Sequence, residues 1–395
     1  MLIEILLAIG LGILAGIFTG LIPGLHINLI GAIVVSFATK NPLGFPIYFA
    51  VGIVAMSITH TFLDFIPSIF LGCPNEDTSL SSLPGHELLK QGKGYEAVML
   101  SAKGCFIGIF LLLAITPLLI IIIPPVYEFI KKLIPFILIF VIVILILTEQ
   151  KKISATIVIL LSGFLGLVVL NFDLKEPLLP LLSGLFGSSS LILTIKNNVQ
   201  IPKQEFTSSK INYFKPILGS LIASPLCGFL PGLGSSQAAV LGNTVAKTDK
   251  KSFLFLLGLT NFLVMGFSFL SVYTISKGRT GVAVAVQTIL GEINKKELFL
   301  LLIVILISGI IAFFLTKKLA KIIATKINEI NYLKIALFTL ILLSILTLLV
   351  SGFFGFLILI ISTFTGIYCI SLNVKRTNMM GCLLIPTILF YFGLG

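Results

Sequence analysis

The sequence has few of the side chains that build polar active sites or metal centres. Only 11% of its 395 residues are charged, against about 25% in an average soluble domain, and tryptophan is absent. It has three histidines, and its five cysteines show neither a metal-type spacing nor a paired framework. We therefore expect no metal site and no organic cofactor.

Motifs that bind nucleotides or carry out hydrolysis are also missing. The sequence contains no Gly-x-x-x-x-Gly-Lys-Ser/Thr loop, no nucleophile elbow and no His-Glu-x-x-His helix. These absences predict that the protein is neither an ATP-driven motor nor an enzyme of those classes. Any energy that its function needs is expected to come from an Na⁺ or H⁺ gradient or from a partner.

Apolar side chains make up most of what is present. They are 57% of the residues, and the mean hydropathy is +1.16. Apolar runs of about 20 residues, the length that crosses a bilayer, follow one another along the chain. The pattern predicts an all-α polytopic protein of the cell (plasma) membrane, with about 10–12 transmembrane or half-membrane helices.

The net charge of +12 comes from 27 Lys and Arg against 15 Asp and Glu. These charges are scattered over short loops, which is typical of topology signals and of contact with anionic lipids. We expect the lipid bilayer as a partner, and no nucleic acid.

The apolar runs divide the chain into two halves, residues 1–195 and 212–395, joined by a polar, basic linker at 196–211. Three shorter runs cannot cross a bilayer alone and predict half-helices or re-entrant segments: 26–39, 234–246 and 281–291. Full spans are expected at 2–22, 45–71, 96–123, 127–148, 153–170, 177–195, 212–230, 252–275, 297–316, 333–350, 352–372 and 378–394.

One short motif occurs in both halves. The first copy is Gly20-Leu21-Ile22-Pro23-Gly24-Leu25-His26-Ile27-Asn28, and the second is Gly228-Phe229-Leu230-Pro231-Gly232-Leu233-Gly234-Ser235-Ser236-Gln237. Pro-Gly breaks a helix, and broken backbone inside a membrane must face protein or a polar cavity. Thr61-Phe62-Leu63 and Asn261-Phe262-Leu263, then 91–97 and 277–283, follow in the same order. The order predicts two internal repeats, each with one broken helix.

The two breaks predict an anion site, because the N-terminus of a helix offers free N–H donors and a partial positive charge. A matched pair of interrupted spans is typical of the binding sites of transporters. The alternative is that Pro-Gly only kinks two helices for packing. The candidate substrate-binding residues are Pro23, Gly24, Leu25, His26, Asn28, Pro231, Gly232, Leu233, Gly234, Ser235, Ser236 and Gln237.

Ionisable residues near or within the spans are further candidates. His60 and Asp64 share one helix face and are predicted to relay a proton, or to bind Na⁺ with Thr59 or Thr61; alternatively, Asp64 pairs with a lysine near the membrane surface. Lys103 and Arg279 are predicted to neutralise an anionic substrate; the alternative is a solvated loop with a lysine that reaches the interface.

Four segments resemble the large permease subunit of the tripartite tricarboxylate transporters (TctA type). They are residues 16–25, 69–76, 85–94 and 228–234, and the two Pro-Gly-Leu motifs are the most specific. The resemblance implies a polytopic carrier for organic anions such as carboxylates, driven by an ion gradient. It also implies a small membrane subunit and a periplasmic binding protein as partners.

The sequence thus favours a secondary transporter (permease) for a small organic anion, held between two broken-helix N-termini. One alternative is a carrier or flippase for an anionic polyprenyl-phosphate-type lipid, since a related group of carriers also has Pro-Gly motifs. Another is an intramembrane enzyme acting on lipid, for which only His26, His60 and Asp64 offer reactive groups.

Overall fold

The computed structural model describes residues 2–22, 27, 31, 34–35, 46–72, 77–197, 201–207, 209–229, 234–327 and 332–394, and most of these residues are helical. No strand occurs among these described residues. Seven of their helices are long and apolar enough to cross a membrane. The prediction of an all-α polytopic membrane protein is therefore confirmed.

The helices follow the chain in this order. The first half contains α1 (Leu2–Leu21), α3 (Pro46–Leu63), α4 (Phe65–Phe70), a 3-10 turn η1 (Ser79–Ser81), α5 (Ser82–Lys90), α6 (Gly94–Ile130), α7 (Ile134–Leu147), α8 (Lys152–Leu170), α9 (Leu178–Leu182), a π-helical turn η2 (Ser183–Ser188) and α10 (Ser189–Asn197). The second contains α11 (Phe214–Phe229), α12 (Ser235–Ala246), α13 (Lys250–Ile275), α14 (Gly281–Leu290), α15 (Lys295–Lys326), α16 (Tyr332–Ser371), a 3-10 turn η3 (Arg376–Met380) and α17 (Gly381–Tyr391).

Most predicted helix boundaries lie within a few residues of the observed ones, but two helix ends were wrong. The span predicted to end at 316 continues as α15 to Lys326. The sequence predicted an end near 123–127, but α6 continues to Ile130 through Pro117, Pro124 and Pro125. Each proline removes one backbone hydrogen bond, and neighbouring groups make such a loss tolerable in membrane helices. The predicted break near 351 is present, because Gly352 (φ 71°, ψ −168°) is non-helical and splits α16 into two helices.

Helices α1 and α3 pack closely and run in the same direction. A Cβ on Gly12 would lie 2.8 Å from the Cβ of Ala55, and one on Gly20 would lie 2.8 Å from that of Leu63. Gly16 meets Thr59 between them. Small residues spaced four apart let two helix backbones approach closely. Such close packing stabilises helix pairs in lipid, where the hydrophobic effect does not drive helices together.

The second half also contains a parallel pair of helices, α11 and α13. Ser220 of α11 hydrogen-bonds to Thr260 of α13 (2.9 Å), and the Ser271 hydroxyl donates to the Gly228 carbonyl (3.2 Å), so α11 and α13 are parallel. Helix α12 runs back alongside α11, since its Gly242 packs on Gly219 of α11. The internal duplication stays a prediction, but both halves contain a parallel helix pair beside the Pro-Gly motif.

Helices α3 and α13 run in opposite directions. Helix α6 is parallel to α13, because Gly104 lies against Phe255 and Gly266 lies against Leu112. It is antiparallel to α3 and α4, because Phe70 approaches Gly94 while the Thr61 carbonyl approaches Cys105. The rings of Phe62 and Phe262 pack edge to face at 5.9 Å where α3 and α13 cross. The two parallel pairs are therefore inverted relative to each other.

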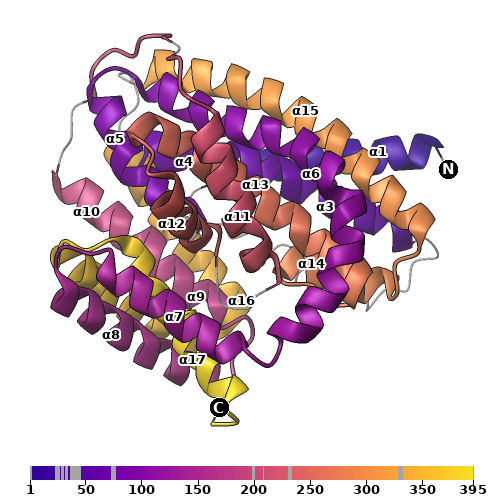
Figure 1. Ribbon diagram of the computed structural model, residues 1–395. Coiled ribbons are helices and arrows are strands. Elements are labelled where there is room, and N and C mark those ends of the chain that lie inside the picture. Colours follow the sequence, from indigo (N-terminus) through magenta and orange to yellow (C-terminus); the bar gives the residue numbers. More distant parts are fainter. Residues whose placement is uncertain are drawn as a thin grey trace.

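The helices form two packed groups (Figure 1). The larger buries α3 and α13 inside α1, α6, α11 and α15, so that 89% and 94% of the apolar windows of α3–α4 and α13 are buried. The smaller contains α7, α8, α9, α16 and α17, at the lower left of Figure 1. It combines helices from both halves of the chain. The division at 196–211 stays a prediction.

Candidate functional site

A cavity of about 310 Å³ lies where the two groups of helices meet. The larger group contributes residues from the middle of α13 and from the start of α14, and the smaller group contributes apolar side chains from α9, η3 and α17. The lining residues are Ile27, Asp77, Leu178, Leu182, Gly234, Asn261, Val264, Met265, Arg279, Thr280, Gly281, Val284, Met380 and Leu383.

Helix α12 begins at this cavity. Gly234 is extended (φ −83°, ψ 170°) and precedes the first helical residue, Ser235. The Gln237 side chain reaches back, and its Oε1 accepts a hydrogen bond from the Gly234 N–H (2.8 Å). A glycine before the helix has no side chain to satisfy the next free N–H groups, so the donors at Ser235 are available to another group.

The group that uses them is Asp77, from the polypeptide between α4 and α5. Its Oδ1 accepts from the Ser235 N–H (3.1 Å) and from the Ser235 hydroxyl (2.7 Å). The Asp77 carbonyl accepts from the Ser236 hydroxyl (2.8 Å). A carboxylate at a helix N-terminus is stabilised by the free donors and by the helix dipole.

Asn261 faces the same start of α12 from the middle of α13. It is 4% exposed, lines the cavity, and its Oδ1 accepts from the Ser235 hydroxyl (3.0 Å). The Asn261 Nδ2 group makes no hydrogen bond with the described residues. It is a buried amide donor at the wall of the cavity.

A second helix N-terminus, that of α14, opens on the cavity. Thr280 precedes this helix and its Oγ1 accepts from the Ala283 N–H (3.3 Å). The Ser268 hydroxyl of α13 accepts from the N–H groups of Arg279 (3.2 Å) and Thr280 (2.9 Å), which fixes the turn before α14. Arg279 therefore comes to the cavity on an anchored turn.

These groups give the cavity a mixed electrostatic character. The dipoles of α12 and α14 and the guanidinium of Arg279 favour negative charge, and the Asp77 carboxylate supplies one. Leu178, Leu182 and Leu383 form an apolar wall on the other side of the cavity. Chemically, the arrangement is suited to holding a small anion.

The predicted Pro-Gly breaks lie outside the described residues: Pro23, Gly24, Leu25, His26, Asn28, Pro231, Gly232 and Leu233. The described residues beside them, Ile27 and Gly234, both line the cavity. Of the other predicted binding residues, Ser235, Ser236 and Gln237 form the first turn of α12. Arg279, predicted to neutralise charge, also lines the cavity.

The predicted coupling residues lie at the end of α3, away from the lining of this cavity. His60 is 3% exposed, and its Nδ1 is 3.1 Å from the Thr19 hydroxyl of α1. Asp64 is 5% exposed, and the Thr59 hydroxyl donates to the Ala55 carbonyl (2.8 Å). Lys103, on α6, is half-buried and is not a lining residue.

Sequence reasoning missed three of the polar residues at this site, Asp77, Asn261 and Thr280. Asn261 was noted only as a landmark of the predicted repeat, and Asp77 was not among the candidate residues. A signal for Thr280 exists, because a threonine directly before a short apolar run is a typical helix N-cap. No comparable local pattern marks Asp77.

Spanning helices around a cavity with charged and polar groups in its wall are typical of membrane transport proteins. The model of the tripartite tricarboxylate transporter TctA family matches residues 6–381, and the chain belongs to this family. The resemblance seen in the sequence is thereby confirmed. Members of this family normally work with other subunits of a tripartite system, including a binding protein.

The chain is also 33% identical over 400 residues to an uncharacterised protein of Methanocaldococcus jannaschii, with 98% of each chain covered. No solved structure matches the chain.

Proposed function

We propose that this protein is a secondary transporter for a small organic anion of the carboxylate class, bound in the cavity between α12, α13 and α14. The observation that carries the proposal is that the N-termini of α12 and α14 and the residue Arg279 all line one cavity. A volume of about 310 Å³ is at the lower end of the range of small-molecule pockets.

The inverted helix pairs support a transport mechanism. Sites between inverted repeats near the middle of the membrane are typical of carriers that expose one site alternately to the two sides. Asn261 and Met265 place the cavity near the middle of α13, at the crossing of the oppositely directed α3 and α13. Rocking of one pair against the other would then open the cavity to either side.

The charge distribution supports one orientation in the cell membrane. Lysines near the starts of α6, α11 and α13 are Lys90, Lys93, Lys203, Lys210, Lys215, Lys247, Lys250 and Lys251. Lys321 of α15 joins this end, since its ammonium lies over the Phe206 ring. The opposite end has fewer cations, namely Lys131, Lys132, Lys277, Arg279, Lys295 and Lys296, since α15 runs antiparallel to α6 and begins at this end. By the positive-inside rule, the end where α6 begins is cytoplasmic.

The coupling ion is proposed to act at the buried end of α3. Asp64 and His60 are both almost fully buried, and because an ionisable group inside a membrane protein is costly, such residues are candidates for a functional role. Asp64→Asn is expected to abolish accumulation driven by an Na⁺ or H⁺ gradient while leaving substrate exchange active. Undiminished accumulation by this variant would assign Asp64 a purely structural role.

Uptake into proteoliposomes tests the function directly. Labelled citrate and succinate are offered under an imposed Na⁺ or H⁺ gradient. A labelled polyprenyl phosphate is offered in parallel to test the alternative of lipid transport. We expect carboxylate uptake by the wild type and its loss in Arg279→Gln, with uptake retained in the control Lys295→Gln, an exposed lysine outside the cavity. Equal uptake by both variants, or movement of the lipid alone, would contradict the proposal. Uptake measured with and without an added binding protein and small membrane subunit shows whether transport requires these partners.

A further inference from the structure

The start of α12 already has a carboxylate bound to it. Asp77 Oδ1 occupies the donors of Ser235, its N–H at 3.1 Å and its hydroxyl at 2.7 Å. These are the donors that an anionic ligand in the cavity would need at this helix. Asp77 itself lines the cavity, and its second oxygen makes no hydrogen bond with any described residue.

This contact differs from an ordinary helix cap. A capping side chain comes from the residue directly before the helix, whereas Asp77 lies 158 residues from Ser235 in the sequence. The ordinary capping position is Gly234, where an added Cβ would lie 2.7 Å from Gln237 Oε1 and 3.5 Å from Asp77 Oδ1. The absence of a side chain there leaves the space in which the distant carboxylate reaches the helix.

The attachment of Asp77 is limited. Within the part of the chain that the structure describes, Asp77 forms no salt bridge, and its carboxylate is held by one N–H group and one hydroxyl. The Ser235 hydroxyl has a single proton and also lies 3.0 Å from Asn261 Oδ1. A ligand carboxylate that takes these donors, and also meets Arg279 and Asn261 Nδ2, has more partners than Asp77 has.

We propose that Asp77 is an internal competitor for the anion site: its carboxylate holds the N-terminus of α12 when the cavity is empty and leaves when a substrate carboxylate binds. This inference rests on the proposed transport function. Asp77 lies shortly before η1 and α5 in the chain. Its release on ligand binding would therefore change the position of the segment 77–92, which packs on α4 and α6.

The test measures binding of citrate by calorimetry and the melting temperature in acetate, on the purified full-length protein. Asp77→Ala is expected to bind citrate about tenfold more tightly or better, because it loses both the competitor and a like charge. Acetate should raise the melting temperature of Asp77→Ala, by filling the vacated position, and leave that of the wild type unchanged. The matched control Asp173→Ala, an exposed carboxylate on another loop, should behave as the wild type.

Asp77→Asn keeps an oxygen that can accept a hydrogen bond from Ser235 and removes only the charge. This variant therefore tests whether Asp77 competes with the ligand even if the alanine variant does not fold. It should bind citrate more tightly than the wild type, by a smaller factor. Wild-type or weaker citrate affinity in these variants, with no effect of acetate, would overturn the competitor and leave the transport function standing. Absence of carboxylate uptake by the wild type would instead contradict the function itself.

Discussion

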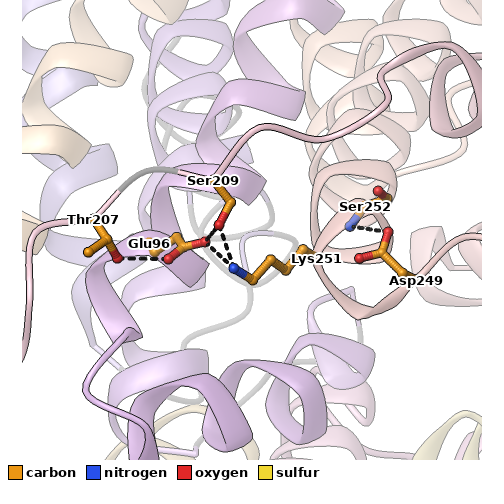
Figure 2. Close-up of polar contacts among 6 residues, drawn as sticks. All are labelled: Glu96, Thr207, Ser209, Asp249, Lys251 and Ser252. Carbon is orange, nitrogen blue, oxygen red and sulfur yellow. Dashed lines mark hydrogen bonds and ion pairs between the residues drawn. The ribbon is translucent and has the colours of Figure 1, made fainter.

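Glu96 and Asp77, both from the first half of the chain, form contacts with helices of the second half. The two carboxylates differ strongly in the number and kind of their partners. Glu96, at the start of α6, is 2% exposed and lies 2.8 Å from the Lys251 ammonium of α13. Thr207 and Ser209 of the linker also donate to it (Figure 2). Asp77 meets only the Ser235 N–H and hydroxyl, and it lines a cavity.

The difference separates a fixed attachment from a replaceable one. Glu96 has a cation and two hydroxyls, so its charge is compensated where water is excluded. Gln204 strengthens the same junction, because its side chain bonds to the Gly94 N–H (2.8 Å) and the Leu89 carbonyl (3.1 Å). Asp77 has no such cation among the described residues, and a ligand can take its place. The fixed attachment therefore lies at the end of the helices, and the replaceable one at mid-depth.

The largest effect on stability is expected at Glu96. Glu96→Ala removes the partner of Lys251, which is 29% exposed and recovers part of its hydration. We therefore expect the free energy of unfolding to fall by about 2–3 kcal/mol, measured by denaturant titration in detergent micelles. The control is Glu87→Ala, whose partner Lys250 is 72% exposed, with an expected loss of about 0–1 kcal/mol. Equal losses would remove the distinction between the two attachments.

Gly234→Val probes the space through which Asp77 reaches α12. The added side chain would approach Gln237 Oε1 and Asp77 Oδ1, so we expect a loss of about 1–3 kcal/mol in unfolding free energy from overpacking. Gly393→Val, a surface position beside which an added Cβ meets no atom within 4 Å, controls for the valine itself. Its positive φ (71°) adds strain of its own, so only a larger loss at Gly234 supports the account.

Asp249 is a third carboxylate, and it shows what an ordinary cap contributes. It precedes α13, and its side chain accepts from the Ser252 N–H (3.3 Å). Burial tends to raise the pKa of Asp249, but the hydrogen bonds from Ser252 and Lys251 outweigh it, so the pKa lies below its usual value. The stabilisation is therefore present above the unfolded pKa of about 4 and is lost as the pH falls through the lower folded pKa.

Asp249→Ala should accordingly cost about 1 kcal/mol at neutral pH and almost nothing in strong acid. Unfolding titrations at the two pH values measure it. A loss that stays constant as the pH falls would show that the carboxylate charge has no part in the cap.

Asp77→Asn is expected to have a smaller effect on stability than Glu96→Ala. The amide oxygen still accepts from Ser235, so the free energy of unfolding should fall by only about 0.5–1.5 kcal/mol. A loss as large as that of Glu96→Ala would mean that Asp77 is a fixed structural attachment, and the comparison of the two carboxylates would no longer hold.

The sequence was sufficient for the fold class, for most spans and for the short helices α12 and α14, because apolar runs and Pro and Gly positions determine these locally. It failed at α6, where three prolines did not end the helix, since neighbouring helices decide whether a kinked backbone is tolerated. Asp77 was not predicted as a site residue, because its role depends on a contact with Ser235 across 158 residues. No local pattern encodes such a contact.

The most direct test of the account is a structure of the protein determined by electron microscopy with and without citrate. We predict that a citrate carboxylate lies within hydrogen-bonding distance of the Ser235 N–H and of Arg279, that Asp77 has turned away from α12, and that Glu96 still contacts Lys251. Citrate bound outside the cavity, or citrate in the cavity with Asp77 still on Ser235, would contradict the account.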